Sequence, residues 1–158
     1  MHIQPYSPHQ QDSLTQLAIR AWDPVFTSLQ GAMDPAVFRE FYPDWRQSQR
    51  EAVRAACTSD EMEVWVALEN EMPVGFVAVK YHREDRMGEI YMIAVDPDHQ
   101  RHGTGSALTE FALGRMQEAG MSVAMVETGG DPGHAPARKT YQKLGFGLLP
   151  IARYFKKL

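Results

Sequence analysis

The fold of this chain is indicated most clearly by the stretch Gln100-Arg101-His102-Gly103-Thr104-Gly105-Ser106. An apolar run, Ile90 to Val95, precedes it and is typical of a strand covered on both faces. Apolar residues spaced three and four apart follow it and predict an amphipathic helix from Thr104 to Gly120. Two glycines therefore stand where a strand is followed by a helix. Glycines next to the unpaired amides and positive dipole of a helix N-terminus form a site for an anion such as a phosphate.

Two common phosphate-binding motifs do not fit this stretch. A P-loop requires a lysine after its second glycine, whereas Ser106 follows Gly105. A dinucleotide-binding fingerprint requires a third glycine at position 108, which is Leu108. Since Gly-x-Gly is common at helix starts, a tight turn without a ligand remains the alternative.

A wider pattern is more specific. Gln100-x-x-Gly103-x-Gly105 after a strand resembles the Q/R-x-x-G-x-G/A signature of the GNAT superfamily of acyl-CoA-dependent N-acyltransferases. His134-x-x-Ala137-x-x-x-Tyr141-x-x-x-Gly145-Phe146 is similar to that family's N-x-x-A-x-x-x-Y-x-x-x-G-F segment. The two motifs follow the family's order, and the resemblance extends from about Gly75 to Phe146. His134 departs from the pattern, because the family often has Asn there.

The resemblance implies a fold of the α/β (α+β) class. We expect a mixed, mostly antiparallel sheet with helices on both faces and a central pair of parallel strands that splay apart. Residues 1–158 form one N-acetyltransferase domain in this interpretation. Its parts are a helical acceptor-side region at 1–60, a coenzyme-binding core at 61–146 and a C-terminal strand at 147–158.

Periodicity and turn residues predict the elements in more detail. The predicted helices are Pro8 to Trp22, broken at Asp23-Pro24, then Val25 to Met33, Pro35 to Tyr42, Trp45 to Thr58, Thr104 to Gly120 and His134 to Leu144. The predicted strands are His2 to Tyr6, Glu63 to Leu68, Pro73 to Tyr81, Gly88 to Val95, Ser122 to Glu127 and Gly147 to Phe155. The many aromatic residues between Trp22 and Trp45 are either core or the wall of an acceptor pocket.

The resemblance also implies that acetyl-CoA is the cosubstrate. The amides of Arg101 to Ser106 would bind its pyrophosphate, and the backbone of Ile93 to Val95 would pair with its pantetheine arm as if with a strand. The N–H of Val95 would then stabilise the oxyanion. His134 would either cap its helix or contact the coenzyme. The expected coenzyme-binding residues are Ile93, Ala94, Val95, Gln100, Arg101, His102, Gly103, Thr104, Gly105, Ser106, His134 and Arg138.

Acyl transfer to an amine requires a base for the amine proton and an acid for the departing thiolate. Tyr141, at the family's tyrosine position, is the expected acid. Glu89 is the expected base, because a period of two places it on one strand face with Tyr91, Ile93 and Val95. Glu127 and a chain of water molecules are the alternatives for the base.

Composition limits the classes of function. The chain has 158 residues, 44% of them hydrophobic and 23% charged, as in an ordinary globular domain. We expect no membrane span and no signal peptide. The single cysteine, Cys57, cannot form an internal disulfide, so a cytoplasmic location is the expectation. A metal site is not expected, since His99 and His102 have no further ligand cluster.

The net charge of −4 argues against a general nucleic-acid binder. Basic residues nevertheless cluster near the C-terminus, where Arg138, Lys139 and Lys143 could face a polyanionic ligand. The resemblance carried by the two motifs implies transfer of an acetyl group to a primary amine by direct attack in a ternary complex. The acceptor is a small-molecule or protein amine, and a homodimer is an open alternative. The competing hypotheses are a catalytically weak acyl-CoA sensor or scaffold, and a site for another anion such as a nucleotide.

Overall fold

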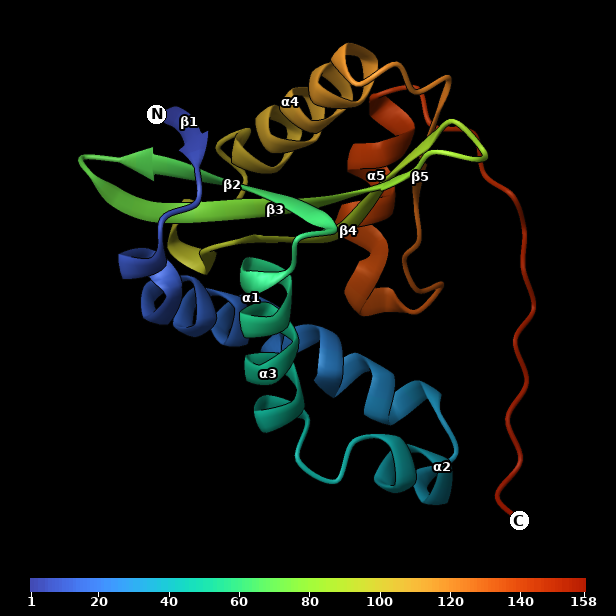
Figure 1. The fold of residues 1–158 in the computed structure, drawn as a ribbon. Helices are drawn as coiled ribbons and strands as arrows, with labels where there is room; N and C mark the ends of the chain where they lie inside the picture. The colour runs from blue at the N-terminus through green and yellow to red at the C-terminus, as the bar shows by residue number, and fades with distance from the viewer.

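The computed structural model describes residues 1–158, and its centre is one mixed five-stranded sheet (Figure 1). The strands lie in the order β1-β2-β3-β4-β5. Neighbours among the first four are antiparallel, whereas β5 pairs parallel with β4. Their bounds are β1 (His2–Pro5), β2 (Met62–Glu69), β3 (Met72–His82), β4 (Met87–Val95) and β5 (Val123–Val126). This confirms the predicted fold class.

Helices cover both faces of the sheet (Figure 1). The face opposite α4 carries α1 (Gln11–Ala32) and α3 (Trp45–Thr58), joined through α2 (Pro35–Phe41). The other face is covered by α4 (Thr104–Glu118), the crossover between the parallel strands. The helix α5 (Ala135–Lys143) follows β5. Short 3₁₀ turns are η1 (Pro8–Gln10), η2 (Pro97–His99) and η3 (Pro132–His134).

The sheet separates two hydrophobic cores. On one side Leu14, Ala18 and Val53 of the helices pack against strand residues such as Phe76. On the other side Leu108, Ala112 and Met116 of α4 pack against Val77, Val79 and Ile90. These side chains are almost fully buried, and the alternation of β3 residues between the cores follows from the two-residue period of a strand.

The prediction of a helix break at Asp23-Pro24 is wrong. Helix α1 continues from Gln11 to Ala32 with Pro24 inside it. Proline has no N–H, so the carbonyl of Arg20 loses its helical donor. The helix continues because its far half is packed: Phe26 is buried and stacks on Trp45, with ring centroids 4.3 Å apart. Tertiary packing therefore outweighs the local preference of proline.

The predicted final strand over Gly147 to Phe155 is not formed. Residues 147–158 contain no helix or strand and run along the outside of the molecule (Figure 1). Near its end this segment returns to α2, where Phe155 meets Phe41 edge-on and Lys157 Nζ lies 2.8 Å from Glu40 Oε2. Pro150 lacks the N–H that a ladder needs, and β5 pairs only with β4.

Candidate active site

A cleft of about 770 Å³ opens where β4 and β5 part. The last registered pair of these strands is Ile90 with Val126, so residues 92–95 of β4 are paired only with β3. The splayed parallel pair expected from the sequence is thereby confirmed. The cleft is lined from several elements, by residues that include Trp22, Val95, Gly105, Glu127, Ala137 and Tyr141.

The open edge of β4 presents backbone groups to this cleft. Asp96 N donates to Val74 O at 2.9 Å, which fixes Asp96 as a hydrogen-bonding partner of β3. In an antiparallel ladder these partners alternate, so Ala94 also bonds β3 while Ile93 and Val95 turn their N–H and C=O groups away. Beyond Ile90, β5 provides no hydrogen-bonding partner for these backbone groups. The amides of Ile93 and Val95 are thus available to an extended ligand.

The prediction that Glu89 lies on the same strand face as Ile93 and Val95 is wrong. A bulge breaks the register of β4 between Ile90, which pairs with Val79, and Met92, which pairs with Ala78, so Tyr91 is the extra residue. Gly88 and Ile90 therefore pack toward α4, while Glu89 lies on the opposite face. Glu89 does not share a face with Ile93 and Val95 and does not line the cleft.

Glu89 has a partner of its own on that opposite face. Its Oε2 lies 2.6 Å from His82 Nε2, and its side chain is 19% exposed. The alternative carboxylate, Glu127, does line the cleft, but it is exposed and accepts a hydrogen bond from Arg153 at 3.1 Å. Of the two acidic candidates, only Glu127 lines the cleft.

The N-terminus of α4 borders the cleft with uncapped amides. Gly103 is the N-cap residue with φ +88°, a conformation that favours glycine, and no side chain caps the helix. The first helical bond runs from Ala107 N to Gly103 O at 2.9 Å, which leaves the amides of Thr104 to Ser106 without helical acceptors. Arg101, also at positive φ (+64°), lines the cleft beside them. This arrangement fits an anionic group.

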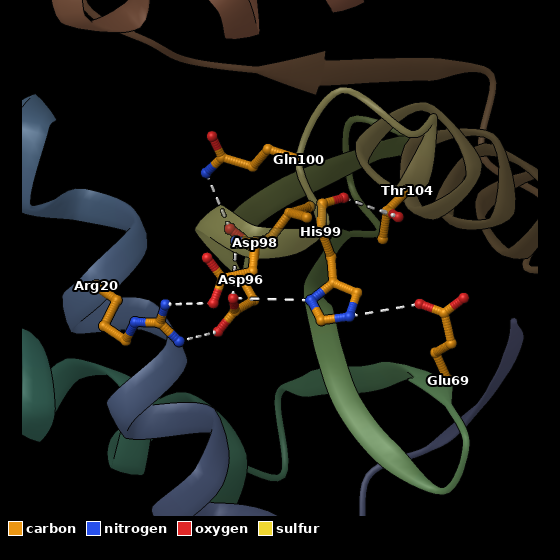
Figure 2. A network of polar contacts seen from close by, with 8 residues as sticks. Arg20, Glu69, Asp96, Asp98, His99, Gln100 and Thr104 are labelled. Carbon is orange, nitrogen blue, oxygen red and sulfur yellow. Dashed lines mark hydrogen bonds and ion pairs between the residues drawn. The ribbon is translucent and has the colours of Figure 1, made fainter.

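A polar network holds the loop between β4 and α4 in place (Figure 2). Arg20 of α1 donates to Asp96 and to Asp98, both at 2.8 Å, and Asp96 caps η2 by accepting from Asp98 N at 3.0 Å. The hydrogen bond from Arg20 lowers the pKa of Asp98. His99 lies 3.4 Å from Glu69 of β2 on the other side of the loop. Helix α1 and strand β2 therefore both brace this loop.

Two of the predicted coenzyme residues use their side chains for this bracing. Gln100 Nε2 donates to Val95 O at 3.0 Å, and Thr104 Oγ1 donates to His99 O at 3.4 Å (Figure 2). Of the predicted coenzyme residues, the structure brings these to the cleft: Ile93, Ala94, Val95, Gln100, Arg101, Gly103, Gly105, Ser106 and His134. His102, Thr104 and Arg138 do not line it.

Tyr141 reaches the cleft from α5. Its side chain is buried, and its ring meets Phe146 edge-on at 5.7 Å. Burial raises the pKa of Tyr141 to about 12, so the phenol is protonated throughout the neutral range. A protonated hydroxyl at the wall of the cleft is suited to donate a proton.

The loop before α5 contains a chain of hydrogen bonds that the sequence did not reveal. His134 Nδ1 lies 2.5 Å from Asp131 Oδ1, and Ser28 Oγ of α1 donates to Asp131 Oδ2 at 2.6 Å. His134 does not cap α5 with its side chain. Arg138 donates to the carbonyl of Asp131 at 2.8 Å, whereas Lys139 and Lys143 line the cleft.

The acceptor-side wall comes from α1 and α3. Trp22, Pro24, Val25 and Gln49 line the cleft there. Trp22 also packs against Phe76 at 6.5 Å, so it belongs to both the core and the wall. The other aromatic residues of this region, such as Phe26 and Phe38, are buried in contacts with one another and do not line the cleft.

The family model of the acetyltransferase (GNAT) family matches residues 30–146. The chain belongs to this family. Among curated relatives, the mycothiol acetyltransferase of Streptomyces coelicolor is 38% identical over 73 residues, which are 46% of this chain and 23% of that protein. That of Thermomonospora curvata is 30% identical over 102 residues, which are 65% of this chain and 33% of the relative. The chain thus spans only about a quarter to a third of these relatives.

Solved structures of GNAT proteins share the fold. An aminoglycoside antibiotic 6'-N-acetyltransferase from Acinetobacter haemolyticus aligns with a TM-score of 0.69 at 15% identity, over 100% of this chain and 99% of the other. The ribosomal-protein-S18-alanine N-acetyltransferase from Escherichia coli aligns at 0.68 and 18% identity, over 94% and 79%. None of the helices in this GNAT chain has the length and apolarity to cross a membrane. No three His, Cys, Asp or Glu side chains gather as a metal site.

Proposed function

We propose that this GNAT domain is an N-acetyltransferase that moves the acetyl group of acetyl-CoA to a primary amine by direct attack in a ternary complex. The observation that carries the proposal is the continuity of the cleft. It joins the uncapped N-terminus of α4 to the open edge of β4 and ends at the buried hydroxyl of Tyr141. An anion site, a strand-like edge and an acid thus follow one another in a single groove.

The residues along the groove fit the parts of acetyl-CoA. The amides of Thr104 to Ser106 and the charge of Arg101 suit a pyrophosphate. The backbone N–H and C=O of Ile93 suit an amide of the pantetheine arm, which would pair as an added strand, and the N–H of Val95 is left for the thioester oxygen. Lys139 and Lys143 border the same cleft and add positive charge for a polyanion.

The amine nitrogen attacks the thioester carbonyl, a C–N bond forms, and the C–S bond breaks. Tyr141 gives its proton to the departing sulfur, and the N–H of Val95 is the proposed donor to the oxyanion. The free amine must first form from an ammonium ion. We assign Glu89 as the base that removes this proton from the ammonium ion. Glu89 contacts His82 and does not line the cleft, so it would act through a water molecule.

The acceptor is proposed to approach from the face that carries α1 and α3, within residues 1–60. Trp22, Val25 and Gln49 form that wall, and its mixture of aromatic and polar groups suits an organic amine. The names of the relatives suggest the classes to try: an aminoglycoside, an amine related to mycothiol and an alanine amine of a ribosomal-protein peptide.

The test is amine-dependent release of coenzyme A thiol from acetyl-CoA, with the acetylated amine identified by mass spectrometry. We expect turnover with at least one of these amines, and loss of turnover in Tyr141→Phe. Binding of acetyl-CoA without turnover on any amine would contradict the enzyme and favour the acyl-CoA sensor.

A further inference from the structure

The ring of His134 is held through one nitrogen, and its other nitrogen has no hydrogen-bond partner in the protein. Its Nδ1 lies 2.5 Å from Asp131 Oδ1. The edge formed by Nδ1 and Cε1 packs over Gly129, where a Cβ would lie within 2.6 Å of Nδ1. His134 is also a wall residue of the cleft. The free edge of the ring that carries Nε2 is therefore the part available to a ligand in the cleft.

Asp131 is built into the fold rather than lying on the surface. Its side chain is only 5% exposed and accepts from Ser28 Oγ at 2.6 Å and from Gly133 N at 3.0 Å, as well as facing His134. Burial raises the pKa of Asp131, but the hydrogen bonds from Ser28 and His134 outweigh it, so the net pKa lies below its ordinary value. Asp131 is thus an ionised partner that fixes the orientation of the imidazole.

These contacts determine which nitrogen is basic. When Nδ1 donates its hydrogen to a carboxylate, the lone pair of a neutral imidazole lies on Nε2. The carboxylate also stabilises the imidazolium that forms when Nε2 takes a proton. Ser28 belongs to α1, so the helix on the acceptor side itself holds this pair in place.

We propose that His134 Nε2 is the base that takes the proton from the reacting nitrogen once it has attacked the thioester. This rests on the proposed acetyl transfer and adds a catalytic residue to it, with Asp131 and Ser28 as positioning residues. The structure favours His134 over Glu127 for this role, since Glu127 is exposed and bonded to Arg153.

The protons balance. An ammonium acceptor loses two protons on becoming an amide: one before attack, assigned above to Glu89, and one from the positively charged nitrogen of the tetrahedral intermediate. His134 takes the second as the C–N bond is completed. The C–S electrons leave with sulfur, which receives the proton of Tyr141. His134 then releases its proton to water, and the tyrosinate is reprotonated from water.

Few charged groups take part in the hydrogen bonds around His134, although Glu127, Lys139 and Lys143 line the same cleft. Asp131 lies on its own loop, and Arg138 of α5 turns its guanidinium to the carbonyls of Gly129 and Asp131. Helix α1 contributes the uncharged Ser28. A pH dependence that disappears with the imidazole can therefore be assigned to His134 rather than to a second group in this cluster.

The test compares kcat against pH for wild type and His134→Asn, with the best amine from the screen above. Wild-type kcat should rise with pH, because Nε2 can accept a proton only when the imidazole is neutral. His134→Asn should lose ~10²-fold or more in kcat and show a flattened profile, while its acetyl-CoA-induced rise in Tm stays that of wild type. His9→Asn, at an exposed position near the N-terminus, is the matched control and should behave as wild type.

Two further variants keep the result interpretable. Asp131→Asn should lower kcat about tenfold or more while leaving the site for acetyl-CoA intact, and added imidazole should partly restore His134→Ala. A His134→Asn enzyme with wild-type kcat and an unchanged profile would overturn this proposal alone. Wild-type protein that binds acetyl-CoA but acetylates no amine would overturn the proposed function, and this proposal with it.

Discussion

Ile90 of β4 and Val126 of β5 are the last residues at which the two parallel strands pair. One residue further along β4, the bulge at Tyr91 interrupts the pairing with β3. The opening and the bulge therefore coincide, and together they turn the backbone of Ile93 and Val95 toward the cleft while directing Glu89 to the other face. The β4–β5 pairing stops before the end of β4, and this leaves the backbone of β4 open to a ligand.

Removal of the Tyr141 hydroxyl should separate chemistry from binding. Burial alone raises the pKa of Tyr141 to about 12, so wild-type enzyme should keep its acid across neutral pH. Tyr141→Phe should lower kcat by ~10²–10⁴ and leave Tm and acetyl-CoA affinity nearly unchanged. Steady-state kinetics beside a binding titration measure this. Equal losses in kcat and in coenzyme affinity would contradict the acid role.

Replacement of Pro24 should stabilise the protein. In Pro24→Ala the backbone regains an N–H that can donate to the carbonyl of Arg20, and the ring clash disappears. We expect the free energy of unfolding to rise by about 1–3 kcal/mol in urea denaturation. Pro35→Ala is the matched control, because Pro35 is at the first position of α2, where proline is favourable. A drop in stability for Pro24→Ala would contradict this prediction.

The thiol of Cys57 should be unreactive in the folded protein. Burial raises its pKa to about 11, although a hydrogen bond with Tyr6 opposes the shift. At pH 8 only about one thiol in a thousand is then ionised. Iodoacetamide should label the native protein ~10²-fold more slowly than the protein in urea. Labelling of native Cys57 at the rate of the unfolded chain would contradict this burial. Slow labelling also makes thiol release a clean assay.

Asp131 should contribute stability that depends on pH. Because its folded pKa lies below the unfolded one, this contribution is present above the ordinary aspartate value of about 3.9 and is lost as pH falls through and below it. Asp131→Asn should therefore be less stable than wild type near pH 7, and the difference should shrink toward pH 3. Melts across this range would show it. A difference that is the same at pH 7 and pH 3 would contradict the ionised role.

The parts of the fold that local pattern controls were predictable from the sequence. Asp34-Pro35 begins α2 as expected, with the Asp34 side chain accepting from two backbone amides. The strand-to-helix turn at Gly103 also has the positive φ that its glycine implied. In both cases the preference of one or two residues decides the local conformation.

The remaining features depend on contacts between distant residues. The helix through Pro24 depends on packing of Phe26 against Trp45, and the face of Glu89 depends on a bulge that no periodicity shows. Ser28 and Asp131 are 103 positions apart, so their hydrogen bond could not be read from either neighbourhood. The segment after Gly147 has no strand partner, because β5 pairs only with β4, and Pro150 within it lacks a ladder N–H.

The most direct measurement is a thermal melt with and without acetyl-CoA, for wild type, Gly103→Glu and Gly114→Glu. Both variants add one negative charge to α4 or its N-cap where a new Cβ has no neighbour within 4 Å, but only Gly103 is at the proposed phosphate site. Because Gly103 has φ +88°, its variant also strains the backbone, so the quantity compared is the rise in Tm that acetyl-CoA causes within each protein. At a concentration of about 100 times its Kd, acetyl-CoA should raise the free energy of unfolding by ~2.7 kcal/mol. That corresponds to a rise of roughly 5–10 °C in wild type and Gly114→Glu, with almost none in Gly103→Glu. No rise in wild type, or an equal rise in all three proteins, would contradict the coenzyme site.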